Sequence, residues 1–345
     1  MLSNDSVECL TIRAVDDSRA IIVLRDEVQQ GTLPTFHQDA TPERDFALYL
    51  LASSCRSLSL DGLHFQAVIA KSTRHSLIFQ KGSCLRITNC TCVDTTTAPP
   101  ALQMAYGTNR FVCHVTSGGP WSAKGEWLTW VENNAFIHPA ALQPSQKETR
   151  LAETVFHTEH YGSQESRNLA RNLVYRNCLF GSNLFVVGSF DAELTEVITF
   201  EQCTMLGRMA HFECHSDFPA TLAKRKFHCT DNLVIAPDNP VITTSADLFS
   251  KTQVEGGGNA YWQTAGTIRS DDRNRGSLSL LPGPLLKAMP AFGGTATAAD
   301  PLKPFRLKSG PPLDKMATDG GTVGVRFEYL PAPPPFRSEM IKRVK

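Results

Sequence analysis

Short stretches in which apolar residues alternate with other residues recur along the first 265 residues of the chain. Each stretch has eight positions: apolar, any, apolar, any, a turn-forming residue (Asn, Gly, Gln or Asp), a small or apolar residue, any, and apolar. An alternation with period two predicts a strand with one buried face. The segments that follow this form are Leu58–Phe65, Leu85–Cys92, Thr129–Phe136, Leu173–Phe180, Ile198–Met205, Phe227–Val234 and Val254–Tyr261.

The fifth position of the repeat is expected to turn the chain from one strand into the next, because Gly and Asn accept left-handed backbone conformations. Each gap of 44 residues is interpreted as two turns of 22, with the intervening coils near Phe111–Cys113 and Val155–His157. Repetition at this spacing is typical of a solenoid, whose coils stack at about 4.8 Å with parallel strands. The sequence therefore predicts an all-β fold, a right-handed parallel β-helix (solenoid). The fifth-position residues are Gly62, Asn89, Asn133, Asn177, Gln202, Asp231 and Gly258, separated by 27, 44, 44, 25, 29 and 27 residues.

The sixth position of the repeat is expected to face inward, at a crowded corner of each coil. Cysteine occupies it at Cys90, Cys178 and Cys203, and asparagine occupies it at Asn134, Asn232 and Asn259. A buried Cys behaves as a small apolar residue, and a buried Asn can satisfy its amide along a ladder of equivalent residues.

Two other fold classes fit the sequence less well. An antiparallel sandwich needs closely spaced hairpin turns, and only Asp61-Gly62 and Asp319-Gly320 have that chemistry. A doubly wound α/β fold needs amphipathic helices between its strands, and convincing ones are scarce. After about residue 264 the repeat gives way to Gly, Pro and Ala. We therefore expect residues 1–265 to form the β-helix and residues 266–345 an irregular Pro/Gly-rich C-terminal cap with an extended tail.

Charge and hydropathy exclude some classes of partner. The 34 basic residues balance the 34 acidic ones, so neither nucleic acid nor an anionic membrane is suggested. No apolar run is long enough for a membrane-spanning helix. The first residues lack the basic and apolar regions of a signal peptide, so we expect a cytoplasmic location unless an upstream segment is missing.

The repeat and the tail resemble the pectate-lyase-like superfamily of right-handed β-helices, over roughly residues 8–265. The segment 304–325 is similar to one that ends many such proteins, with Pro311 in place of a Ser and Met316 in place of a Gly. The chain is also similar to modules that follow protein kinase domains in some bacterial signalling proteins. The features that carry this second resemblance are the degenerate coils, the segment Gly257–Trp262 and the Pro-rich end. The kinase motifs themselves are not present in this sequence.

The tryptophans around residue 125 are the best candidates for a binding surface. Exposed aromatic rings on a β-helix face would stack on sugars or anchor a partner. Trp121 and Trp127 are the predicted binding residues, whereas Trp130 is expected to belong to the core.

Catalytic and metal-binding signals are weak. Asp271, Asp272 and Arg273 supply acid chemistry in one stretch, but they follow the last clear coil and are better interpreted as a solvated loop. Histidine and cysteine groups match no zinc spacing, so no metal and no cofactor are expected. These groups include His157, Glu159, His160, His211, Cys214, His215, Cys113-His114 and His228-Cys229.

The sequence therefore favours a non-enzymatic scaffold or recognition module with a protein or glycan partner, and an enzyme is the less favoured class. The resemblance implies two alternatives: a polysaccharide lyase or glycoside hydrolase, or the non-catalytic region of a bacterial serine/threonine protein kinase. An enzyme of this superfamily would need carboxylates from different coils to converge, together with Arg or Lys. A map of the outward faces distinguishes these hypotheses.

Overall fold

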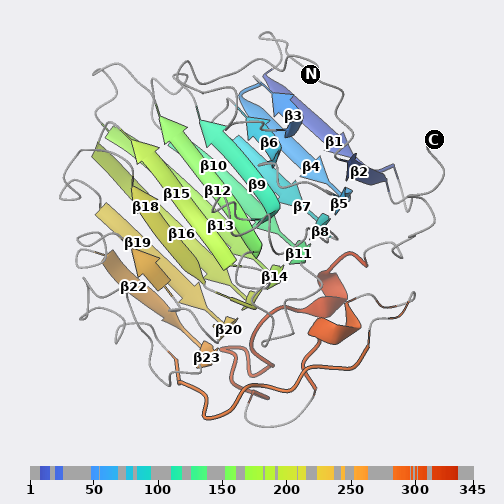
Figure 1. The fold of residues 1–345 in the computed structure, drawn as a ribbon. Coiled ribbons are helices and arrows are strands. Elements are labelled where there is room, and N and C mark those ends of the chain that lie inside the picture. Colours follow the sequence, from blue (N-terminus) through green and yellow to red (C-terminus); the bar gives the residue numbers. More distant parts are fainter. Residues whose placement is uncertain are drawn as a thin grey trace, which may run out of the picture.

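In the described part of this all-β chain, the strands pair in parallel throughout and form three sheets. Successive turns of the chain contribute one strand to each sheet in rotation, so equivalent strands lie side by side (Figure 1). This arrangement is compatible with a parallel β-helix. Sheet A contains β1 (Cys9–Arg13), β4 (Ser57–Asp61), β7 (Cys84–Thr88), β10 (Glu126–Glu132), β13 (Asn168–Arg176), β16 (Glu193–Glu201), β19 (Lys224–Thr230) and β22 (Thr252–Gly257).

The other two sheets follow the same order. Sheet B contains β2 (Ile21–Arg25), β5 (His64–Val68), β8 (Thr91–Asp94), β11 (Ala135–Ile137), β14 (Leu179–Gly181), β17 (Thr204–Met205), β20 (Leu233–Ile235) and β23 (Ala260–Trp262). Sheet C contains β3 (Leu48–Ser53), β6 (His75–Gln80), β9 (Arg110–Gly118), β12 (Ala152–His160), β15 (Asn183–Phe190), β18 (Ala210–Cys214) and β21 (Ile242–Thr244).

The computed structural model describes somewhat more than half of the chain, and in most of sheet C it describes the backbone but not the side chains. The described residues are 8–15, 20–25, 48–53, 55–68, 75–80, 84–94, 110–118, 126–137, 152–160, 168–181, 183–190, 193–207, 209–214, 224–236, 242–244, 252–262, 283–295, 297, 300, 302–308 and 313–332. In this part of the chain, no helix has the length and apolar character needed to cross a bilayer.

The corner residues adopt the conformation that the repeat predicts. All seven fifth-position residues have left-handed φ angles, from 48° at Asn177 to 69° at Gly62. Three of the side chains form a ladder: Asn89 donates to Asp61 at 2.8 Å, Asn133 to Asn89 at 3.3 Å, and Asn177 to Asn133 at 2.8 Å. The predicted corners between sheets A and B are therefore confirmed.

The prediction that each 44-residue gap holds two coils is wrong. Strand β7 pairs directly with β10, and β10 pairs directly with β13, so each gap is one coil. The segments Phe111–Cys113 and Val155–His157 lie in β9 and β12 of sheet C, which pair with each other. These coils are long because extra residues connect their three strands, while the corners remain in register.

The sixth-position residues face the interior, as predicted. Cys90, Cys178 and Cys203 are completely buried, and so are Asn134, Asn232 and Asn259. The inward side chains of the strands continue this core as stacked aromatic rings, with ring centroids 4.9 Å apart for Tyr175–Phe200 and 5.2 Å apart for Phe136–Phe180.

One ion pair is buried inside the core. Arg171 on β13 and Glu196 on β16 are register partners, and Arg171 Nη1 lies 3.0 Å from Glu196 Oε1 with both side chains at most 2% exposed. Burial raises the pKa of the nearby Tyr175 hydroxyl well above its ordinary value, so this hydroxyl stays protonated.

A C-terminal segment, here called the strap (residues 302–308 and 313–330), covers the outer face of sheet B. Its short helices η5 (Lys303–Phe305) and η6 (Phe327–Tyr329) lie near its two ends. Seven of its apolar side chains form one buried cluster with the outer side chains of sheet B, and Figure 1 shows the segment in red along that side. The strap residues in this cluster are Leu302, Phe305, Leu313, Ala317, Val323, Val325 and Leu330.

Hydrogen bonds attach the strap to successive coils. The backbone N–H of Gly324 donates to the Asp231 carbonyl at 2.7 Å, that of Val325 to Thr204 Oγ1 at 3.0 Å, and that of Arg326 to Asn177 Oδ1 at 2.6 Å. Three consecutive residues thus bind three consecutive coils, and the strap crosses the strands.

The division of the chain into a β-helix and a C-terminal cap at residue 265 stays a prediction.

Candidate functional site

The three tryptophans considered in the sequence differ in position and exposure. Trp121 lies outside the described residues. Trp127 is only 5% exposed and points inward from β10, next to its register partner Arg171, so it offers no surface platform. Trp130 was expected in the core, but it is half-buried on the outer face of the same strand. Alternation along β10 explains both positions, because residues three apart on a strand point to opposite faces.

The weak catalytic and metal candidates do not assemble into a site in the described chain. Asp271, Asp272, Arg273 and His215 lie outside the described residues. Cys113, His114, His157, Glu159, His160, His211 and Cys214 lie on strands whose side chains are not described there. His228 and Cys229 point to opposite sides of β19, with Cys229 in the core. A search of the described residues finds no group of three or more His, Cys, Asp or Glu that could hold a metal ion.

The structure describes most of the outward side chains of sheet A. Outward residues of neighbouring strands are register partners, and they form rows across the sheet. The charged row contains Arg13, Asp61, Thr88, Glu132, Arg176, Glu201 and Thr230. The middle row contains Thr11, Ser59, Arg86, Trp130, Val174, Thr199, His228 and Glu255. The third row contains Cys9, Ser57, Cys84, Leu128, Asn172, Val197, Lys226 and Gln253.

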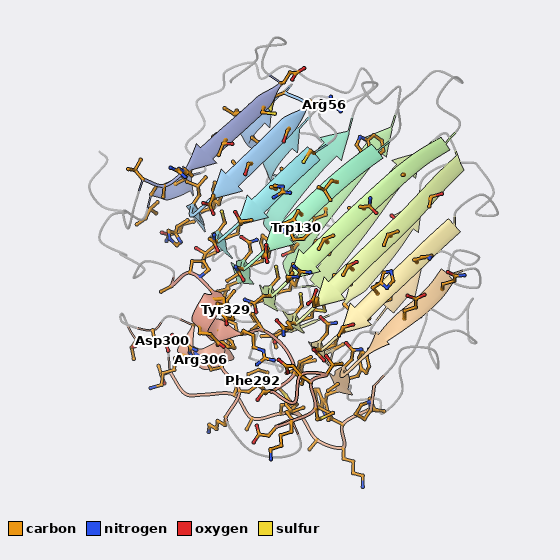
Figure 2. The ribbon with its side chains drawn as sticks, turned by 180° about the vertical axis from the view of Figure 1, so that it is seen from behind. Arg56, Trp130, Phe292, Asp300, Arg306 and Tyr329 are labelled. Atoms are coloured by element: carbon orange, nitrogen blue, oxygen red, sulfur yellow. The ribbon has the colours of Figure 1, made fainter. Side chains whose placement is uncertain are left out.

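Trp130 lies near the centre of this face (Figure 2). Its indole N–H donates to Glu132 Oε2 at 2.9 Å. The guanidinium carbon of Arg86 lies 5.8 Å from the ring centroid, and that of Arg176 lies 5.3 Å from it. These two arginines are on the strands that flank β10, so they approach the ring from opposite sides. Cation–π attraction therefore orders the ring and both guanidiniums together.

Arg176 connects this tryptophan to two carboxylates. Its Nε donates to Glu201 Oε2 at 2.9 Å, and its Nη1 lies 4.0 Å from Glu132 Oε1. We call Arg86, Trp130, Glu132, Arg176 and Glu201 the Trp130 cluster. An ion pair of this exposure contributes little to the free energy of unfolding. The main effect of these contacts is that they hold the side chains of the cluster in one arrangement.

An apolar centre lies beside the Trp130 cluster. Leu128, Trp130, Val174 and Val197 are half-buried outward residues of three adjacent strands, β10, β13 and β16. Charged side chains border them on the same face: Arg86 and Lys226 are exposed, and Glu132, Arg176 and Glu201 are half-buried. An apolar centre containing Trp with a charged rim containing Arg is the composition of a protein–protein interface.

The carboxylates of the described face are engaged with donors. Asp61 accepts hydrogen bonds from Thr88 and Asn89, both at 2.8 Å. Glu132 and Glu201 share Arg176, and Glu255 lies 3.2 Å from His228. General acid–base catalysis needs a carboxyl group directed at a substrate. This arrangement is better suited to binding than to proton transfer.

The repeat itself contains the signal that would have identified this face. Arg86, Trp130 and Val174 all occupy the second position of their copies, and Glu132 and Arg176 occupy the fourth. Second and fourth positions alternate with the buried first and third ones, so they point outward. By this alternation Trp130 belongs to the outer face and not to the core.

Comparison of the chain with protein-family models, with curated proteins and with solved structures found no match.

Proposed function

We propose that the chain is a non-enzymatic recognition module, a right-handed parallel β-helix of the pectate-lyase-like type, which binds a protein partner through the outer face of sheet A. The observation that carries the proposal is the apolar centre around an ordered tryptophan, bordered by carboxylates that are already engaged. Trp and Arg are the residues that most often dominate the binding energy of protein interfaces.

A protein partner fits this face better than a glycan does. Stacking of a sugar ring needs a bare aromatic face, but Arg86 and Arg176 flank Trp130 on its two sides. A sugar would have to displace a guanidinium before it could stack. A protein side chain needs only the edge of the ring and the aliphatic surface of Leu128, Val174 and Val197.

The proposal is tested by truncating the centre of the face. The full chain is immobilised, captured proteins are identified, and their dissociation constants are measured by calorimetry. Trp130→Ala is expected to weaken a specific partner by tenfold or more, since a central hot-spot residue contributes about 2 kcal/mol or more. Tyr329→Ala is the matched control, because Tyr329 is an aromatic residue with 63% exposure on the strap. Equal effects of the two variants would contradict the proposal.

A polysaccharide lyase or glycoside hydrolase is the alternative that one observation favours. Glu132 and Glu201 lie on either side of Arg176, so two carboxylates and a guanidinium from three coils meet there. We expect no cleavage products from uronate-containing or neutral polysaccharides. Cleavage that disappears in both Glu132→Gln and Glu201→Gln would replace the recognition proposal with this alternative. The association with a bacterial protein kinase stays a prediction from the resemblance.

A further inference from the structure

The acidic and basic side chains next to the apolar centre differ in whether they already have a partner. Within the described part of the chain, the acidic residues of the face have hydrogen-bond or ion-pair partners, whereas Arg86 and Lys226 have no carboxylate within ion-pair distance. Both side chains are exposed. Arg86 is held over Trp130, so its position costs little additional entropy when it binds an anion.

These two cations lie at the two ends of a continuous line of residues. Arg86, Trp130 and Val174 are consecutive register partners in the middle row, and Val197 and Lys226 are register partners in the third row. The line crosses β7, β10, β13, β16 and β19 in order. We call these five residues the diagonal stripe. It presents a cation, three apolar side chains and a second cation.

The length of the stripe defines the ligand that matches it. Five neighbouring strands span four intervals of about 4.8 Å, which is about 19 Å across the sheet. An extended peptide advances about 3.4 Å per residue, so about six residues cover this distance. A segment with one acidic residue at each end and aliphatic residues between them would complement the stripe in charge and in polarity.

We propose, on the basis of the proposed function, that the partner presents an extended segment in which two acidic residues about six positions apart flank an aliphatic stretch. One carboxylate pairs with Arg86, the other pairs with Lys226, and the aliphatic side chains cover Trp130, Val174 and Val197. A uniformly anionic partner fits less well, because the neighbouring Glu132 and Glu201 would repel it.

The test is a selection of random displayed dodecapeptides on the full chain, followed by calorimetry with synthetic copies of the enriched peptides. The expected consensus has two Asp or Glu residues at this spacing with aliphatic residues between them. Arg86→Gln and Lys226→Gln should each weaken such a peptide about tenfold, which corresponds to the loss of about one charge-assisted contact. Arg13→Gln removes an exposed cation from the same sheet outside the stripe and should leave the affinity unchanged.

Charge reversal separates a direct contact from an indirect effect. The Arg86→Glu variant should lose the acidic peptide and regain affinity when the acid at that end of the peptide is replaced by lysine. Peptides without the paired acids, or equal losses in Arg86→Gln and Arg13→Gln, would overturn the inference. So would Arg86-dependent binding of a uronate oligosaccharide or of phosphatidylserine vesicles without binding of the peptides.

Two outcomes separate the charge pairing from protein recognition by sheet A. Peptides that need Trp130 but neither Arg86 nor Lys226 would refute the charge pairing and leave protein recognition by sheet A intact. Binding that Trp130→Ala does not weaken would refute both.

Discussion

Asn and Cys share the buried corner position because both can donate to the same carbonyl groups. Asn134 Nδ2 donates to the carbonyl two residues earlier at 2.9 Å and to one in the preceding coil at 2.7 Å. The Cys90 thiol reaches the equivalent two carbonyls at 3.1 and 3.8 Å. Both side chains also accept: Asn134 Oδ1 accepts from the Cys90 N–H at 2.7 Å, and Cys90 Sγ accepts from the Leu63 N–H at 3.4 Å. Because sulfur is a weak acceptor, a cysteine at this position binds the neighbouring N–H more weakly than an asparagine does.

Cys203→Asn should stabilise the protein. Its new Oδ1 would accept from the Cys178 N–H, as Asn232 Oδ1 already accepts from the Cys203 N–H at 2.9 Å. We expect the free energy of unfolding in urea to rise by about 1 kcal/mol. Cys203→Ser keeps a donor but does not extend to the neighbouring coil, so it should not stabilise. A loss of stability in the Asn variant would show that the corner cannot hold the larger side chain.

Lys315 adopts a left-handed conformation that a side chain disfavours. Its φ is 64°, and the side chain is exposed. The resemblance places a glycine at Met316, so the left-handed residue lies one position earlier than that comparison implies. Lys315→Gly should raise the free energy of unfolding by about 1 kcal/mol, because it relieves this strain. Lys315→Ala removes the same side chain but keeps Cβ, and it should give no such gain.

At the level of elements, the strap depends on a close approach at Gly324. Its φ is 89°, and a Cβ there would lie 2.5 Å from Thr204 Oγ1, the group that binds the Val325 N–H. Gly324→Ala should therefore lift the strap from sheet B and increase hydrogen–deuterium exchange over residues 313–330. Gly320→Ala is the control, since Gly320 also has a positive φ of 78° but has no atom within 4 Å of the Cβ position. If exchange rose equally in both variants, backbone strain rather than the contact would be responsible.

The loop of the strap is closed by Asp319. The Gly321 N–H and the Arg326 guanidinium lower the pKa of this exposed carboxyl group, and Arg326 Nη2 lies 2.7 Å from Asp319 Oδ2. Arg326 also binds Asn177 through its backbone. The loop and the attachment of the strap to the coils are thus coupled through one residue.

On the scale of the whole molecule, each coil contacts mainly its two neighbours, and stability is transmitted along the stack. The buried pair Arg171–Glu196 joins β13 to β16 near the middle of the stack. Glu196→Gln leaves a buried guanidinium without its carboxylate and should cost about 3–5 kcal/mol. Because the defect lies between two halves of the stack, we also expect the urea transition to broaden or divide.

The control for this prediction uses the same two strands. Glu201→Gln breaks the pair between Arg176 and Glu201, which joins β13 to β16 on the outer face at 40% and 35% exposure. It should cost less than about 1 kcal/mol. Comparable losses in Glu196→Gln and Glu201→Gln would contradict the role assigned to burial.

The sequence by itself determined the corners, the inward position after them and the outward positions between buried residues. These features are local: alternation has period two, and Asn or Gly accepts a positive φ at the turn. Applied to residues 127–130, the same alternation places Trp130 on the outer face and Trp127 on the inner face.

Only the tertiary structure decided which strands are neighbours. The 44-residue gaps proved to be single coils, because pairing of β7 with β10 and of β10 with β13 is a contact between distant residues that no local pattern specifies. The Trp130 cluster depends on that pairing, since Arg86, Trp130 and Arg176 come from three coils. The strap depends on it too, because its three consecutive N–H groups meet acceptors that lie together only after the coils have stacked.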